Sequence, residues 1–157
     1  MRIILQLITV LVAGISLCGC QTLGSTTLIS SSAPQDLSPG AAATIARDLA
    51  GSLVERVGVG TTTISFASDG SAFGYVLEEE LRSEGYAIFT DRSMDLDRGF
   101  LPLAYVVDRF EGSVLVRLST PDLTLTRIYA ITAEDAEPAS PWSVMTIGGD
   151  GSGEPDT

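Results

Sequence analysis

The sequence predicts a small α+β domain in which two helices pack on one face of a mostly antiparallel sheet of about five strands. Two amphipathic stretches, with apolar residues three and four positions apart, are separated by a stretch of alternating residues. Three strand-like runs joined by very short connections follow, and such connections enforce antiparallel pairing. The order is helix, strand, helix, strand and three further strands, which is typical of two helices covering one sheet face.

The first helix is expected to begin at Ser38-Pro39. Serine can accept a hydrogen bond from an unsatisfied amide group of the first turn, and proline suits the first helical position because it lacks such a group. Apolar residues then recur at helical spacing, namely Ala42, Ile45, Ala46, Leu49, Leu53 and Val57. Gly58-Val59-Gly60 lacks the further glycine of a dinucleotide-binding fingerprint, so we interpret it as the stop of this helix.

A strand and a second helix are expected next. Residues 61–68 alternate in the manner of a strand, and the turn Asp69-Gly70-Ser71 can cap a helix that runs to about Glu84. The buried stripe of that helix consists of Phe73, Val76, Leu77 and Leu81. Gly85 stands where a left-handed residue would end the helix, and residues 86–91 read as a short strand.

The second half of the domain is predicted to be a meander. Strand-like runs cover residues 102–110, 113–120 and 123–132. Glu111-Gly112 and Pro121-Asp122 are turn signals between them.

The two ends of the mature chain are expected to lie outside the domain. Residues 21–38 are rich in Ser and Thr without an apolar period, which predicts a flexible linker. From Ala133 onward the chain carries prolines, glycines and acidic residues, which predicts an acidic tail that is disordered in isolation. The expected organisation is a signal at 1–19, the lipidated cysteine and linker at 20–38, the domain at 39–132 and the tail at 133–157.

The amino-terminal segment has the pattern of a bacterial lipoprotein signal. Arg2 supplies a positive charge, and residues 3–16 are mostly apolar but too short for a spanning helix, which needs roughly 20 apolar residues. Leu17-Cys18-Gly19-Cys20 resembles the lipobox, although Ala, Ser or Thr is more usual at the position of Cys18. The resemblance implies diacylglyceryl transfer to the sulfur of Cys20 and cleavage between Gly19 and Cys20.

The lipobox also bears on localisation. An aspartate directly after the lipidated cysteine would retain a lipoprotein at the inner membrane, and Gln21 occupies that position here. The resemblance therefore implies an outer-membrane lipoprotein with its domain facing the periplasm. The alternative is an uncleaved apolar anchor in which Cys18 and Cys20 are ordinary residues.

The composition excludes several classes of function. The formal net charge is -11 and the nine basic residues are all arginines, so nucleic acid phosphates and anionic lipids would repel the chain and direct nucleic acid contact is not expected. The sequence contains no histidine, which removes the commonest general base and most transition-metal sites. We therefore predict no enzyme, no cofactor, no metal and no small-molecule substrate. Cys20 alone remains after cleavage, which excludes an intramolecular disulfide.

Two acidic groups can be considered as chemical sites. Glu78-Glu79-Glu80 with Glu84 could bring carboxylates together for acid–base work, but a solvated helix face is the better interpretation because no apolar pocket is implied. In the charged segment around residues 92–99, Asp91, Asp95 and Asp97 partly resemble a calcium loop. They lack its central glycine and terminal glutamate, and pairing with the neighbouring arginines is the simpler interpretation.

Trp142, Met145 and Ile147 form an isolated apolar cluster in the polar tail. Such a cluster can fold back on the domain or dock on a partner protein, and both interpretations stay open. It is the one indication of an interaction site in the sequence.

Several segments in the same order resemble the TrbH family of conjugal transfer lipoproteins. They are the lipobox with Cys20-Gln21-Thr22, residues 43–49, 77–91, 102–107, 114–119, and 138–145 with its two prolines. The resemblance implies a structural subunit of the mating-pair-formation apparatus, a type IV secretion system that moves plasmid DNA. It also implies that other secretion-channel subunits, in an oligomeric complex, are the partners.

Two other functions compete with this one. An accessory lipoprotein of another secretion or surface-appendage assembly system is the alternative, because Phe73 to Leu81 followed by Gly85 resembles curli-secretion and flagellar-assembly lipoproteins over about a third of the chain. A periplasmic enzyme would instead require a polar cleft with convergent titratable groups.

Overall fold

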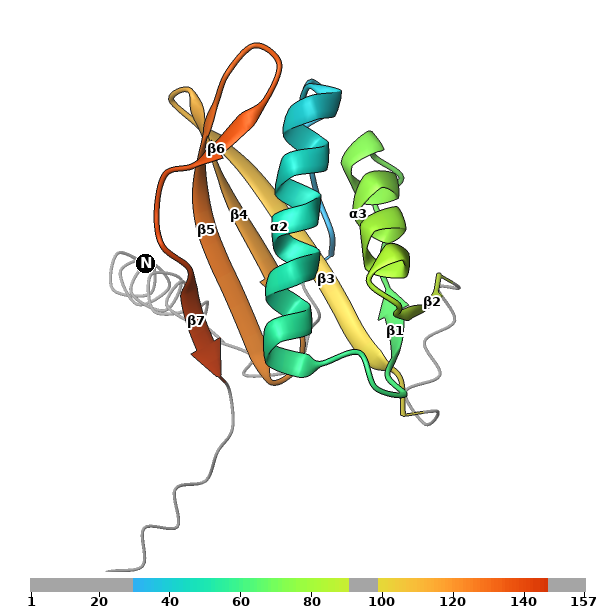
Figure 1. Ribbon diagram of the computed structural model, residues 1–157. Helices are drawn as coiled ribbons and strands as arrows, with labels where there is room; N and C mark the ends of the chain where they lie inside the picture. Colours follow the sequence, from blue (N-terminus) through green and yellow to red (C-terminus); the bar gives the residue numbers. More distant parts are fainter. Residues whose placement is uncertain (1–29, 91–98, 147–157) are drawn as a thin grey trace, which may run out of the picture.

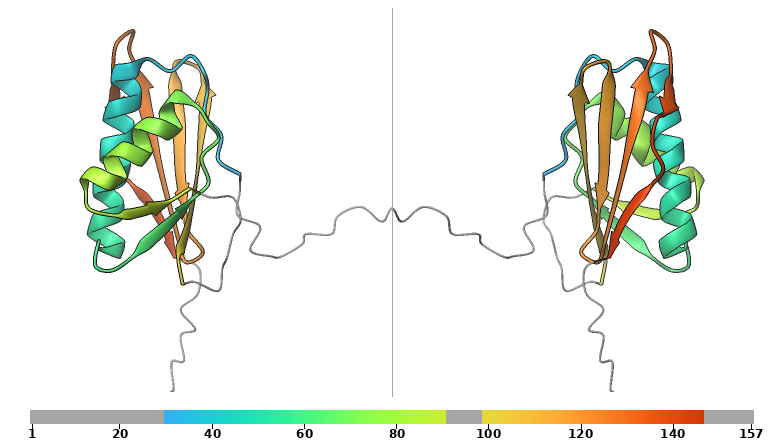
Figure 2. Two further views of the ribbon diagram at one scale, coloured as in Figure 1. Left: turned by 90° about the vertical axis from the view of Figure 1, so that its right-hand side faces the viewer. Right: turned by 90° about the vertical axis from the view of Figure 1, so that its left-hand side faces the viewer.

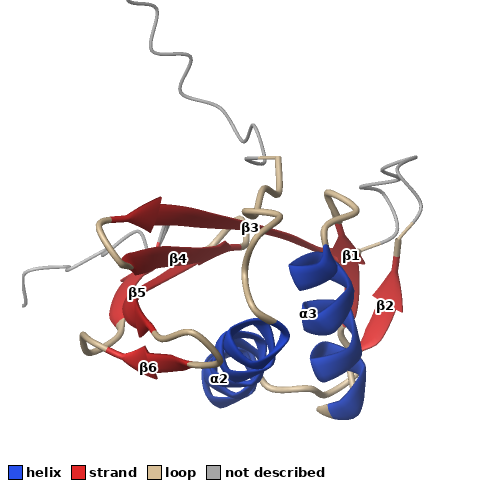
Figure 3. Ribbon diagram, turned by 90° about the horizontal axis from the view of Figure 1, so that it is seen from above, coloured by secondary structure: helices blue, strands red, loops and turns tan. Residues whose placement is uncertain are grey.

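The computed structural model describes residues 30–90 and 99–146. Two helices and seven strands follow one another in this part of the chain: α2 Pro39–Val57, β1 Thr63–Phe66, α3 Ala72–Ser83, β2 Ala87–Phe89, β3 Leu101–Phe110, β4 Ser113–Ser119, β5 Leu123–Ile131, β6 Ala136–Pro138 and β7 Ser143–Thr146 (Figure 1). Both helices lie on the same face of the sheet (Figures 2 and 3). The predicted α+β class is confirmed.

The sheet has the order β2-β1-β3-β4-β5, and β6 and β7 both pair with the outer edge of β5. β1 runs parallel to β2 and β3, whereas the other pairs are antiparallel. In the meander, Leu118 pairs with Tyr105 on one side and with Leu125 on the other. This register turns all three side chains to the helices, where they are at most 1% exposed.

The helix boundaries follow from the capping residues expected from the sequence. The Ser38 hydroxyl accepts a hydrogen bond from the amide of Ala41 at 3.2 Å, and Pro39 occupies the first turn. The Ser71 hydroxyl accepts one from the amide of Gly74 at 3.0 Å. Gly58 ends α2 with a φ of 74°, a conformation that a glycine adopts without a Cβ penalty.

The core lies between the helices and the inward face of the sheet. The apolar stripe of α2 is buried except at its last residue, Val57, which is 37% exposed. The stripe of α3 is buried at Phe73, Leu77 and Leu81, and α3 also packs against α2. The inward residues of β3, β4 and β5 form the opposite wall, so one apolar layer holds the two secondary-structure layers together.

The chain after Thr132 differs from the predicted disordered tail as far as Thr146. β6 pairs Ala136 with Ile131, and β7 pairs Val144 with Leu125, so these two short strands cover the outer edge of β5. The edge of β5 offers backbone groups that need partners, and strands of three and four residues suffice to pair them. Residues 147–157 lie outside the described part of the chain.

The last part of the predicted flexible linker also packs on the domain. Ser32 donates its amide to the carbonyl of Tyr105 at 3.0 Å and accepts from the amide of Val107 at 2.9 Å. Ser31 is buried, and its hydroxyl accepts from the Tyr105 amide at 3.2 Å. Residues 31 and 32 therefore pair with β3 beyond the point where β1 ends, and the outer edges of β3 and of β5 are each covered by two short segments.

Neither helix in the described ranges is both long enough and apolar enough to cross a membrane. The predicted signal, Gly19 and Cys20 lie outside those ranges.

Candidate functional site

The three residues of the predicted docking cluster do not come together in the structure. Trp142 is partly buried and packs against the hydrophobic core. Met145 is 56% exposed and pairs with Thr124, whose side chain points to the sheet face opposite the helices. Ile147 lies outside the described residues.

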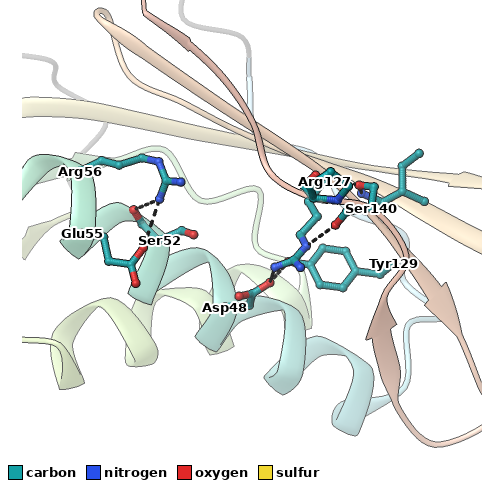
Figure 4. A network of polar contacts seen from close by, with 9 residues as sticks. Asp48, Ser52, Glu55, Arg56, Arg127, Tyr129 and Ser140 are labelled. Carbon is teal, nitrogen blue, oxygen red and sulfur yellow. Dashed lines mark hydrogen bonds and ion pairs between the residues drawn. The ribbon is translucent and has the colours of Figure 1, made fainter.

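Trp142 belongs instead to a polar cluster between α2, β5 and the connection from β6 to β7. We call it the Arg127 cluster, and its members are Asp48, Arg127, Tyr129, Ser140 and Trp142. The carboxylate of Asp48 accepts from the Arg127 Nη1 at 2.7 Å, and the same oxygen accepts from the Tyr129 hydroxyl at 2.6 Å. Figure 4 shows these residues facing one another. The Arg127 Nε donates to the backbone carbonyl of Ser140 at 2.8 Å.

Two aromatic rings complete the surroundings of Arg127. Its guanidinium carbon lies 5.8 Å from the centroid of the Tyr129 ring and 5.2 Å from that of the Trp142 ring. A guanidinium group is planar and weakly hydrated, so it can contact aromatic faces while its N–H groups remain hydrogen-bonded. Arg127 thus ties the connection from β6 to β7 to both the sheet and the first helix.

Burial shifts the pKa of the tyrosine in this cluster. It raises the pKa of the Tyr129 hydroxyl well above its usual range, and the hydrogen bond to the Asp48 carboxylate raises it further. Tyr129 therefore stays a hydrogen-bond donor at any physiological pH. The side chains of Arg127 and Asp48 are 19% and 31% exposed, so their ion pair is screened less than a surface pair would be.

An open pocket of about 550 Å³ lies beside the cluster, between α2 and the connection from β6 to β7. Its wall consists of Thr44, Arg47, Asp48, Gly51, Ser52, Glu55, Pro138 and Trp142. The charged groups in this wall already have partners, since Arg47 pairs with Glu80 at 3.4 Å. Glu55 likewise pairs with Arg56 at 3.5 Å, as Figure 4 shows. The wall therefore presents internally paired charges.

A second polar cluster holds the amino-terminal segment. We call it the Asp69 cluster, and its members are Ala33, Asp69, Ser71, Gly74 and Tyr105. Asp69 accepts from the amide of Ala33 at 2.8 Å, from the amide of Ser71 at 2.9 Å and from the hydroxyl of Tyr105. The Ser71 hydroxyl caps α3 through the amide of Gly74 at 3.0 Å and lies 3.4 Å from the Tyr105 hydroxyl. The cluster joins residue 33, the start of α3 and β3.

The pKa values of Asp69 and Tyr105 in this cluster shift in opposite directions. Burial opposes the charge of Asp69, but the hydrogen bonds from Ser71, Tyr105 and Ala33 outweigh it, so the pKa of Asp69 is lowered. Burial and then the bond to Asp69 raise the pKa of Tyr105 to about 12. Its ring also lies between Phe66 and Phe73, at centroid distances of 5.7 Å and 5.2 Å, which fixes the orientation of its hydroxyl.

Sequence reasoning missed both clusters, although one signal was present. Arg127 occupies an inward position of β5 in the alternating series of Leu123, Leu125 and Tyr129. A cation on the buried face of a strand needs a carboxylate partner. Asp48, which directly precedes the buried Leu49 in α2, is that partner.

The acidic groups considered from the sequence do not form a metal or acid–base site in the described residues. Glu78 pairs with Arg82 at 2.5 Å and Glu80 pairs with Arg47, and their side chains are only 13% and 20% exposed. Glu79 is exposed, so it alone of these three lies as a solvated helix face predicts. Within residues 30–90 and 99–146, no group of three or more Cys, Asp or Glu side chains could hold a metal ion. The aspartates of the charged loop, Asp91, Asp95 and Asp97, lie outside these ranges.

Comparison with known proteins assigns the family. The family described as "Conjugal transfer protein TrbH" matches residues 23–148. A "Probable conjugal transfer protein TrbH" from Sinorhizobium fredii (strain NBRC 101917 / NGR234) is 38% identical over 148 residues, which cover 92% of this chain and 97% of that protein. No solved structure gives a significant match to the chain. Since the family match spans both polar clusters and the whole described domain, the chain belongs to the TrbH family of conjugal transfer proteins.

Proposed function

We propose that this protein is an outer-membrane lipoprotein that serves as a structural subunit of a conjugative type IV secretion apparatus. The observation that carries the proposal is the order of two features in the chain. The lipobox ends at Cys20, directly before the family match that begins at residue 23. An anchor and a conjugal transfer domain thus occupy one chain, which suits a periplasmic component held at the outer membrane.

The beginning of the described domain supports a position close to the membrane. Nine residues lie between Cys20 and Ser30, and the ten Cα-to-Cα steps between these two residues span at most about 35 Å when fully extended. Ser31 and Ser32 are already hydrogen-bonded to β3, so no further length is available from this segment while the domain is intact. An acylated Cys20 would therefore hold the edge of the sheet within about 35 Å of the lipid surface.

The polar clusters support a structural role. In both of them the tyrosine hydroxyl donates a hydrogen bond to the aspartate carboxylate. The carboxylate also accepts from a group of another element, so each cluster fastens a chain segment to the domain. The accessory-lipoprotein alternative relies on about a third of the chain, whereas the family match covers residues 23–148. We therefore favour the conjugative context, with other channel subunits as partners.

The anchor is tested by labelling donor cells with an alkyne analogue of palmitate. Wild-type protein should carry the label and fractionate with the outer membrane, and Cys20→Ser should lose the label and stay unprocessed because the acceptor sulfur is gone. Cys18→Ser is the matched control, since it removes the neighbouring sulfur and should keep the label. A labelled Cys20→Ser protein would contradict the anchor.

The structural role is tested by purifying the tagged protein from detergent-solubilised outer membranes of cells that express the whole transfer operon. Secretion-channel subunits should co-purify, and the frequency of plasmid transfer should fall in the Cys20→Ser strain. Recovery of the lipoprotein alone in good yield would contradict membership of the apparatus. The same purification from the Cys18→Ser strain should recover the same subunits.

A further inference from the structure

The sheet face opposite the helices carries an apolar patch at one end. Side chains of paired residues lie on the same face, so the register places Asp108, Leu115 and Ile128 in one row across β3, β4 and β5. The next row contains Phe110 and ends at Glu137 on β6. We call these five residues the outer-face patch. Phe110 is 69% exposed and Ile128 is 41% exposed, large values for side chains of this type.

The patch is a local feature of that face. Its residues Asp108, Phe110, Leu115 and Ile128 line a groove of about 370 Å³, together with Arg109, Ser113 and Val114. The neighbouring row consists of Val106, Arg117 and Thr126, and the row beyond it consists of Ala104, Ser119 and Thr124. These residues are smaller or polar, although Met145 on β7, which pairs with Thr124, adds one exposed apolar side chain at the far edge. Phe110 and Ile128 are the large exposed apolar side chains beside the turn between β3 and β4. The face that bears them is the one turned away from both helices (Figure 2).

Acidic side chains border the groove. Asp108 lies in the patch on β3, Glu137 lies at the end of the neighbouring row on β6, and Glu111 lies in the turn between β3 and β4; all three are exposed. Arg109 also lines the groove, and its guanidinium pairs with Asp36 at 3.2 Å. Arg117 is one row farther from the turn. Three exposed acidic side chains therefore lie in or beside the groove, and the arginine in its wall is already paired with a further aspartate.

We propose that the outer-face patch binds a basic amphipathic segment of another protein subunit. Apolar side chains of that segment would cover Phe110 and Ile128, and its Lys or Arg residues would face Asp108, Glu111 and Glu137. An anionic lipid surface does not fit this groove, because the acidic rim repels it. A second copy bound through the same patch does not fit either, because the two rims would repel each other. The inference goes beyond the proposed function and does not depend on the lipid anchor.

Site-specific photo-crosslinking of the full chain in cells that express the transfer operon tests the proposal. A benzophenone-bearing analogue replaces Phe110, and the matched control carries it in place of Tyr75, which is 61% exposed on α3. The analogue at position 110 should give a protein adduct whose cross-linked peptide contains both apolar and Lys or Arg residues, and the analogue at position 75 should not give that adduct. An adduct with lipid, with a second copy, or with a peptide that lacks basic residues would overturn the proposal, as would no adduct.

Charge reversal tests the electrostatic part. Glu137→Lys and Asp108→Lys should each reduce the yield of the adduct about tenfold, since each places a like charge opposite the basic segment. Glu79→Lys, an equal change on the exposed face of α3, should leave the yield unchanged. Equal loss in all three variants would overturn the assignment. Thermal unfolding of each variant shows that the domain remains folded, and labelling at Cys20 reports separately on the anchor.

Discussion

The Arg127 cluster and the Asp69 cluster each place a buried tyrosine hydroxyl against an aspartate, but they compensate the carboxylate differently. Asp48 accepts from the guanidinium of Arg127 at 2.7 Å, and that cation also contacts two aromatic rings. Asp69 accepts from two backbone amides and a hydroxyl, and none of its described partners is a cation. One cluster holds the carboxyl-terminal connection on α2, and the other holds residue 33 against the start of α3.

This difference shows two ways to fasten a chain end onto a small domain. An ion pair gains energy from the charge of its partner, and removing that partner leaves an uncompensated charge that is partly withdrawn from water. Backbone amides are part of the fold itself, so their contribution depends on correct geometry more than on any one side chain. A substitution that removes a charge should therefore destabilise the Arg127 cluster most. A substitution that adds atoms between the packed groups should destabilise the Asp69 cluster most.

The largest effect is expected from Arg127→Met. It removes the cation from Asp48, the bond to Ser140 and both ring contacts, so the free energy of unfolding should fall by roughly 3 kcal/mol. Urea unfolding of the mature chain measures this change. Arg117→Met is the control, because Arg117 lies on the opposite sheet face and its loss should change stability by less than about 0.5 kcal/mol. Equal losses in the two variants would refute the role of the ion pair.

Gly74→Ala tests whether the Asp69 cluster depends on space. A Cβ at position 74 would collide with the hydroxyl of Tyr105 and lie 2.9 Å from the hydroxyl of Ser68. The substitution should destabilise the domain by roughly 2 kcal/mol, although alanine usually favours a helix. Gly51→Ala in α2 is the control, because nothing lies within 4 Å of its Cβ position, and it should stabilise by about 0.5–1 kcal/mol. A gain of stability in both variants would show that the close packing is not needed.

Asp69→Asn tests the hydrogen-bonded carboxylate and should lower the free energy of unfolding by about 1.5 kcal/mol near neutral pH. The pKa of Asp69 is lowered on folding, so the ionised carboxylate contributes stability above its unfolded pKa near 3.8 and loses it as the pH falls through the lower folded value. The difference between wild type and variant should therefore shrink below about pH 4. Urea titrations at pH 6 and pH 3 measure it, and a difference that grows in acid would contradict the assigned direction.

The smallest effect is expected from Trp142→Leu. The substitution keeps an apolar side chain but removes one ring from Arg127, which should cost about 1 kcal/mol. Met145→Leu, three residues later on the exposed strand β7, should be nearly neutral. If the two variants lost equal stability, Trp142 would have no special part in the Arg127 cluster. Thermal unfolding of the three proteins in parallel is sufficient to compare them.

Local patterns predicted most of the fold. The capping serines Ser38 and Ser71, the helical stripes behind them and the short turns at Glu111-Gly112 and Pro121-Asp122 depend on neighbours in the chain, and the structure confirms each of them. The family resemblance expected from colinear segments is confirmed as well. These features could be read from sequence because each is set within a few residues.

The covered sheet edges could not be read in this way. β6 and β7 have three and four residues, and residues 31 and 32 form a single bridge to β3, so none of them is long enough to show a periodic pattern. Each pairs with the sheet because a sheet edge with unpaired backbone groups lies beside it. The predicted linker and the predicted tail therefore each include residues that pair with the sheet.

The sequence by itself determined the two helices, the meander, the acidic charge and the lipobox pattern, since these are properties of adjacent residues. Only the tertiary structure decided that Asp48 meets Arg127 across 79 residues and that Asp69 meets Tyr105 across 36 residues. It also decided that Phe110 and Ile128 share one groove on the uncovered sheet face. The physical reason is that strand register and helix placement, which are set by packing of the whole core, choose the partners of buried charges and the neighbours of exposed apolar side chains.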